Sequence, residues 1–138
     1  MSAKPTVSRD DFKRELDEEF ERRSVQALAM GGPGKLAKRA KAGLLDARSR
    51  VDRLFDPGTF TESGLFTTSI HSPEDAERSP CDGKITGYGR IQGRWAAAVS
   101  NDFTVFGASS GATNVRKIAH MKRVATQRGM PMVFLGES

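Results

Sequence analysis

The segment Gly107-Ala108-Ser109-Ser110-Gly111 is the part of the sequence best suited to bind an anion. It directly precedes a helical pattern, so exposed backbone N–H groups and a helix N-terminus would face the same ligand. Such an arrangement can receive a phosphate group. The alternative is a loop that needs glycine only for its backbone geometry, and the residues alone leave both interpretations open.

A run of basic residues is the second candidate. Lys35, Lys38, Arg39 and Lys41 occupy a stretch that contains no acidic residue before Leu45. These cations could contact the phosphates of a ligand or the acidic surface of a partner. A solvated helix face is the commoner origin of such a run.

The remaining reactive side chains are isolated. His71 lies in a polar segment and His120 in a helical pattern, and neither has other candidate ligands near it. Cys81 is the single cysteine and has no histidine at a motif spacing, so we predict no nucleophilic role. The glycines within 87–93 precede a strand and lack the spacing of a dinucleotide fingerprint. The sequence therefore predicts no metal site and no catalytic residue among these side chains.

Length and composition are typical of one soluble domain. The chain has 138 residues, 37% of them hydrophobic and 28% charged, and no apolar run approaches the ~20 residues of a membrane span. The single cysteine excludes an internal disulfide, and early acidic residues argue against a signal peptide. We therefore expect no membrane association and a cytoplasmic location. The net charge of +5 suits a phosphate-bearing ligand or an acidic partner, whereas the 7% of aromatic residues argues against nucleic acid.

A long helix is predicted from about Arg9 to Met30, after a short tail over residues 1–7. Ser8 is its expected N-cap. Its apolar residues recur at helical spacing and form one stripe, which predicts a docking face, while the other faces are nearly all charged. The stripe consists of Phe12, Leu16, Phe20, Val25 and Leu28.

Two shorter helices complete a predicted helical arm over residues 1–58. One covers about 35–42, and Asp46 can cap the next. We expect this arm to pack on the outside of the molecule. Residues 59–82 are predicted to be mainly loop, with a polar and mobile stretch over 72–80.

Beyond residue 83 the pattern changes to strand, strand, helix, strand. Residues 85–91 and 95–99 are predicted strands, joined by a hairpin turn at Gln92-Gly93. A helix follows over 113–128 and a last strand over 132–135. We expect Val115, Ile118, Ala119 and Ala125 to face inward from the helix.

The last two strands and their helix form one right-handed crossover unit. Parallel strands that are apolar on both sides need a layer on each face, and a single helix covers only one. The sheet therefore looks unfinished, and we expect a partner or further chain to complete it.

Four blocks of sequence resemble biotin-dependent acyl-CoA carboxyltransferase subunits, the family of the acetyl- and propionyl-CoA carboxylase β subunits and the related decarboxylases. The blocks are Gly31–Gly43, Ala47–Phe60, Asp82–Arg94 and Asn101–Gly107. The last block, Asn-Asp-Phe-Thr-Val-Phe-Gly, is the most specific. The blocks occur in the family's order and near its spacing, and the resemblance covers about residues 31–138, the opening part of a family member.

The resemblance implies an α/β fold, in which residues 83–138 begin a crotonase-like domain of repeated ββα units and the helical arm precedes it. It implies transfer of a carboxyl group between carboxybiotin, held on a carrier protein, and the α carbon of an acyl-CoA. Backbone N–H donors would stabilise the enolate oxygen. The implied partners are a biotin carboxylase, a biotin carrier, the remainder of the carboxyltransferase chain and further copies in a hexamer.

The resemblance also implies sites. Contact with coenzyme A is expected at Phe106, Gly107, Ala108 and Ser109, with Lys117 or the basic run near its phosphates. The first oxyanion turn of the family, Asp-Ser-Gly-Gly-Ala-Arg, follows the strand that corresponds to 132–135. Here the chain reads Gly136-Glu137-Ser138, so Gly136 and Ser138 lie near that turn, and Glu137 replaces the aspartate.

Two functions thus remain in competition. The first is the N-terminal segment of a carboxyltransferase subunit, whose catalytic centre lies largely outside these 138 residues and which is inactive alone. The second is a small basic module that binds phosphate, nucleic acid or a partner polypeptide without catalysis.

Overall fold

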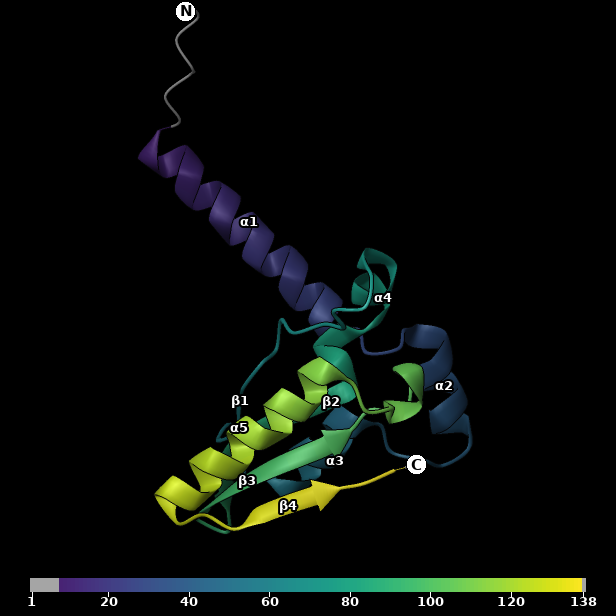
Figure 1. The fold of residues 1–138 in the computed structure, drawn as a ribbon, viewed down its shortest axis with the longest axis vertical. Coiled ribbons are helices and arrows are strands. Elements are labelled where there is room, and N and C mark those ends of the chain that lie inside the picture. The colour runs from purple at the N-terminus through teal and green to yellow at the C-terminus, as the bar shows by residue number, and fades with distance from the viewer. Residues whose placement is uncertain (1–7, 138) are drawn as a thin grey trace, which may run out of the picture.

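The computed structural model describes residues 8–137 as a four-stranded sheet with helices on both faces and one helix that projects from it (Figure 1). The predictions for the tail over residues 1–7 and for Ser138 lie outside these residues. The spatial order of the strands is β1-β2-β3-β4. Their bounds are Thr61–Glu62 for β1, Lys84–Ile91 for β2, Arg94–Asn101 for β3 and Met132–Leu135 for β4.

The predicted hairpin and crossover are both confirmed. β2 pairs antiparallel with β3 through the turn at Gln92 and Gly93, whose φ angles of 49° and 78° are the left-handed values that a two-residue hairpin requires. β3 then pairs parallel with β4 after the crossover helix α5, Ala112–Arg128. Gly129 ends α5 in a left-handed conformation at φ 65°.

The first and third helices begin where the sequence places their caps, and the second begins two residues before the predicted start at about residue 35. α1 is Arg9–Leu28, α2 is Pro33–Lys41 and α3 is Ala47–Leu54. The Ser8 side chain accepts a hydrogen bond from the Asp11 N–H, and the Asp46 carboxylate accepts one from the Ser49 N–H. Both bonds satisfy a free donor at a helix start, which is the physical basis of the prediction.

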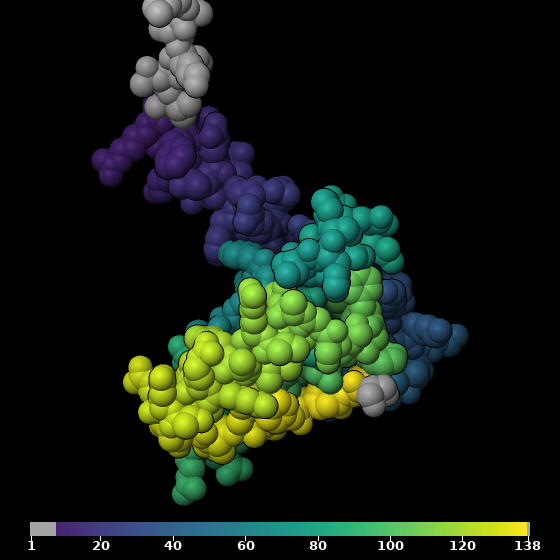
Figure 2. Space-filling model, viewed as in Figure 1, coloured from purple at the N-terminus to yellow at the C-terminus, as the bar shows by residue number. Residues whose placement is uncertain are grey.

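Helix α1 projects from the body of the molecule (Figure 2). Its apolar stripe is largely open, with Phe12, Leu16, Phe20, Val25 and Leu28 each at least half exposed. Within the stripe, the Phe20 ring packs edge-to-face against the Phe66 ring, with 5.5 Å between the ring centres. None of the helices within residues 8–137 has the length and apolarity needed to cross a membrane.

Helix α3 does not lie on the outside, which corrects the prediction for this part of the arm. Ala47 and Val51 are almost fully buried and join the core with Ile85 and Ala98 of the sheet. Successive residues of a strand point to opposite faces of the sheet, so each face needs a covering layer. Helix α3 packs against β2 and β3 on one face and α5 packs against the same strands on the other, as Figure 1 shows. The second layer that the parallel strands require is therefore supplied in part by the chain itself. The boundaries of the arm at residue 58 and of the domain at residue 83 stay predictions.

The segment over 59–82 is more regular than predicted. It contains β1, the helix α4 over Pro73–Arg78 and the short 3-10 turn η1 over Pro80–Gly83. The stretch that we expected to be mobile is α4, and the Ser72 side chain caps it by accepting from the Asp75 N–H. A serine cap, a proline in the first turn and two acidic residues there are sufficient reasons for this helix.

The inward face of α5 also differs from the prediction. Its buried residues are Asn114, Lys117, Met121 and Ala125, whereas Val115 is 53% exposed. Of the four residues predicted to face inward, only Ala125 is fully buried, while Ile118 is partly buried and Ala119 is exposed. Helix α5 is rotated about its axis relative to the prediction. Two of its polar side chains, Asn114 and Lys117, form buried hydrogen bonds with the segments that precede β2 and α5.

Candidate functional site

The loop between β3 and α5 has an unusual backbone. Phe106, Gly107 and Ala108 adopt φ angles of 46°, 60° and 54°, so three successive residues are left-handed and two of them carry a Cβ atom. Left-handed conformations of such residues are costly and persist where the surrounding structure imposes them. Ala108 is 8% exposed, while the Phe106 ring is 39% exposed.

Two buried side chains hold this loop in place. The Lys84 ammonium donates to the Ala108 carbonyl over 2.6 Å, and the Asn114 amide donates to the Ser109 carbonyl over 2.9 Å. Asn114 also accepts from the Gly111 N–H over 3.0 Å. The local sequence pattern does not predict these contacts. The one available signal is Lys84, a charged residue at the first position of a predicted strand.

Lys117 lies in the interior rather than on the surface. Its ammonium donates to the Cys81 carbonyl over 2.7 Å and to the Lys84 carbonyl over 2.5 Å, and the residue is 7% exposed. Burial lowers the pKa of both Lys117 and Lys84. Lys117 therefore anchors α5 to the turn before β2 and to the first residue of that strand. A contact between Lys117 and a ligand phosphate stays a prediction that this position does not favour.

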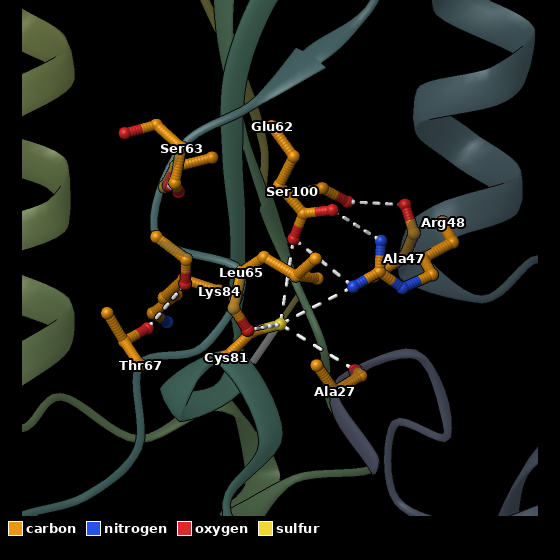
Figure 3. Close-up of polar contacts among 12 residues, drawn as sticks. Ala27, Ala47, Arg48, Glu62, Ser63, Leu65, Thr67, Cys81, Lys84 and Ser100 are labelled. Carbon is orange, nitrogen blue, oxygen red and sulfur yellow. Dashed lines mark hydrogen bonds and ion pairs between the residues drawn. The ribbon is translucent and has the colours of Figure 1, made fainter. Parts of the chain in front are cut away.

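Cys81 sits in a polar cluster beside these anchors (Figure 3). Its sulfur lies 3.4 Å from the Arg48 guanidinium and 3.2 Å from the Leu65 carbonyl, and Arg48 forms an ion pair of 2.7 Å with Glu62. Burial raises the pKa of the Cys81 thiol to about 11. A thiol with this pKa is protonated at neutral pH and is a poor nucleophile, so the cluster is structural.

Two hollows border the Phe106 ring. One, of about 280 Å³, is also lined by Gly31, Lys35 and Arg78, and the Arg78 guanidinium lies 5.6 Å from the centre of the ring. The fold thus brings the first residue of the basic run next to the predicted loop. The other hollow, of about 230 Å³, lies between Ser109 of the loop and Asp75 of α4. It is also lined by Asp82, so it is acidic and not basic. A phosphate-bearing ligand would suit the first.

A second cluster lies where the chain leaves β4. The Arg39 and Arg50 guanidinium groups each lie 2.7 Å from one carboxylate oxygen of Glu137. The Arg39 guanidinium holds the pKa of Glu137 below its usual value. The predicted site residue Gly136 precedes this cluster and is exposed, and Ser138 lies outside the described residues. Sequence reasoning missed both arginines as partners of Glu137.

Residues 38–138 match the sequence family described as the carboxyl transferase domain. The chain belongs to this family. Propionyl-CoA carboxylase β chains are among its relatives: that of Cereibacter sphaeroides is 36% identical over 129 residues and that of Homo sapiens 35% over 127 residues. These alignments cover 91% and 89% of this chain. They cover 25% and 24% of the relatives, so this carboxyl transferase domain chain spans about a quarter of their length.

Solved structures agree with the family. The transcarboxylase 12S structure with methylmalonyl-coenzyme A and methylmalonic acid bound matches 96% of this chain and 25% of its own, with a TM-score of 0.78 and 32% identity. A single-chain, multi-domain long-chain acyl-CoA carboxylase matches 94% of this chain and 14% of its own, with a TM-score of 0.79 and 30% identity. The family predicted from the four sequence blocks is therefore confirmed. Binding of coenzyme A by Phe106–Ser109 of this carboxyl transferase domain stays a prediction.

Replacement of Ala108 by glycine is expected to stabilise the protein by about 1 kcal/mol, because glycine adopts the left-handed conformation without a Cβ penalty. Chemical unfolding of the two proteins would measure the difference. Ala119→Gly is the matched control, since Ala119 is exposed in the right-handed interior of α5 and should lose about 1 kcal/mol. Destabilisation by both substitutions would show that the loop conformation is not strained.

Proposed function

We propose that this chain is the N-terminal segment of a carboxyltransferase subunit that moves a carboxyl group between carboxybiotin and the α carbon of an acyl-CoA. The observation that carries the proposal is the match of 96% of the chain to transcarboxylase 12S, which was solved with methylmalonyl-coenzyme A bound. The β2-β3-α5-β4 unit would then be the start of a crotonase-like fold. The family match disfavours a non-catalytic basic module.

In the proposed reaction the α carbon of the acyl-CoA loses a proton and forms a C–C bond to a carboxyl group. Carboxybiotin on its carrier would supply that carboxyl group and would take up a proton in exchange. The negative charge that develops on the thioester oxygen needs preorganised N–H donors. By resemblance the first donors come from the turn that follows β4, directly after Glu137. The role of this N-terminal segment would be to position that turn and to bind the thioester substrate.

The surface that we propose for the coenzyme A phosphates is the hollow lined by Lys35, Arg78 and Phe106. It combines two cations, Lys35 and Arg78, with one acidic residue, Glu77, and a half-exposed aromatic ring. The charge of these side chains is positive in sum, which suits a phosphorylated ligand. Lys35 is exposed and donates to the Thr104 carbonyl over 2.9 Å, so its ammonium is held at the rim of the hollow. This proposal replaces Lys117 by Lys35 as the nearest cation.

The residues at the exit of β4 do not fit biotin. A carboxylated biotin would need a free cationic or N–H donor for its carboxyl group, and Arg39 and Arg50 there are both paired with Glu137. We therefore assign no step to biotin on this segment. Among the described residues, no three side chains that could ligate a metal ion come together.

We further propose that the biotin carboxylase, the biotin carrier and the remainder of the carboxyltransferase chain are partners. A homo-oligomer is supported by the hexamer assembly named for transcarboxylase 12S. The cytoplasmic location expected from the sequence stays a prediction.

The test is a kinetic comparison of the complete carboxyltransferase subunit that carries this segment, assayed with its carrier partner and propionyl-CoA or acetyl-CoA. Lys35→Ala is expected to raise KM for the acyl-CoA about tenfold with little change in kcat, the effect of losing one charge-assisted hydrogen bond. Lys13→Ala on the exposed face of α1 is the matched control and should leave both constants unchanged. An unmodified subunit that carboxylates no acyl-CoA would overturn the function, whereas an unchanged KM in Lys35→Ala would overturn only the surface.

A further inference from the structure

Three side chains from separate elements converge on Glu137, the second residue after β4. Arg39 of α2 and Arg50 of α3 both donate to the same carboxylate oxygen over 2.7 Å. Asn101, at the end of β3, donates from its side-chain amide to the Glu137 carbonyl over 3.2 Å. Both the side chain and the backbone of Glu137 are therefore held.

Further hydrogen bonds to backbone carbonyls hold the two arginine side chains of the cluster in place. Arg50 also donates to the Asn101 carbonyl over 3.2 Å, and Arg39 donates to the Leu45 carbonyl over 3.0 Å. The side chains of Arg39, Arg50 and Glu137 are 12%, 17% and 24% exposed, so the ion pairs are partly shielded from solvent. Two cations share one anion, and loss of the Glu137 charge would leave the two guanidinium groups unpaired beside each other.

The position of the cluster shows what it controls. The C-terminal end of the described chain lies beside α2, far in sequence from the helices that hold it (Figure 1). Gly136 adds no side chain that could fix the backbone between β4 and Glu137. The direction in which the chain leaves β4 is therefore set by contacts with α2 and α3.

We propose that Arg39 and Arg50 are positioning residues that, through Glu137, fix the turn after β4 in the geometry needed to donate to the enolate oxygen. This inference rests on the proposed function. Oxyanion donors act only within about 2.7–3.1 Å of the oxygen, and a displacement of about 1 Å can reduce the rate about 100-fold. The helices α2 and α3 would then serve the reaction without contacting the substrate.

The experiment replaces Glu137 by glutamine in the complete subunit, which removes the charge and keeps the size of the side chain. We expect kcat to fall about 10- to 100-fold while KM for the acyl-CoA changes less than about twofold. Glu137→Asp keeps the carboxylate and is expected to retain most of kcat. Arg50→Lys keeps the charge and removes the planar fork, so it tests the same contact with a smaller risk of misfolding.

Asp56→Asn is the matched control for the loss of a structural carboxylate. Asp56 accepts from the Gln92 and Gly93 N–H groups at the β2–β3 turn, so its replacement should lower stability and leave kcat unchanged. Unchanged kcat in both Glu137→Gln and Arg50→Lys would overturn the inference, as would an equal fall of kcat in Asp56→Asn. An unmodified subunit without carboxyl transfer would instead overturn the proposed function.

Discussion

The 138-residue chain, expressed by itself, is expected to transfer no measurable carboxyl group between carboxybiotin and an acyl-CoA. It spans 25% of the length of a propionyl-CoA carboxylase β chain. By resemblance, both oxyanion turns and the half that receives biotin lie beyond that quarter. Removal of one oxyanion donor typically lowers kcat about 100- to 1000-fold, so the absence of both turns should lower the rate by about 10,000-fold or more.

The measurement is incorporation of labelled carboxyl groups into propionyl-CoA and acetyl-CoA, with carboxylated carrier protein as donor. The complete subunit, assayed under the same conditions, shows that donor and substrate are competent. Carboxyl transfer by the 138-residue chain at a rate near that of the complete subunit would refute the assignment of the catalytic groups to other segments.

Replacement of Arg48 by methionine is expected to destabilise the protein by about 3 kcal/mol. The Arg48 guanidinium binds both carboxylate oxygens of Glu62, over 2.7 and 3.2 Å, and the two side chains are 20% and 14% exposed. Removing one partner of a shielded ion pair leaves the other charge without compensation, which is more costly than losing the pair itself. Unfolding in urea, followed by circular dichroism, measures the loss.

The double variant Arg48→Met with Glu62→Leu tests the cause. It removes both charges, so it should be more stable than Arg48→Met alone by at least about 1 kcal/mol. If the double variant is the less stable of the two, the loss comes from packing of the Arg48 side chain and not from the unpaired Glu62 carboxylate.

Elements set by local chemistry could be predicted from the sequence. The caps at Ser8 and Asp46 and the hairpin at Gln92-Gly93 depend on residues within three positions of one another, and all three are confirmed. Helix α4 carries the same kind of local signal at Ser72, and there the cap outweighs the polar composition, which alone predicts a mobile stretch.

The rotation of α5 could not be predicted from an apolar pattern. Asn114 and Lys117 are buried because carbonyl groups of the distant residues Cys81, Asp82 and Lys84 accept their hydrogen bonds. Periodicity assigns polar residues to the solvent, and it contains no information about carbonyls that arrive from another part of the chain.

The same reason explains what was missed of the candidate site. Glu137 lies 98 residues from Arg39 and 87 residues from Arg50. In the sequence Arg39 belongs to the basic run over 35–41, and no pattern distinguishes Arg50. Their meeting depends on how α2, α3 and β4 pack, which only the folded chain determines.

The anchored loop at Phe106–Ser109 has a consequence for the energetics of binding. Lys84 and Asn114 fix its backbone through hydrogen bonds within the chain, so the conformational entropy of these residues is already lost when the chain folds. Binding of a ligand to this loop then requires little further ordering of the protein. The favourable binding enthalpy is therefore not offset by a large loss of conformational entropy. Variants that loosen the anchors should therefore weaken binding through entropy, even where every group that touches the ligand is unchanged.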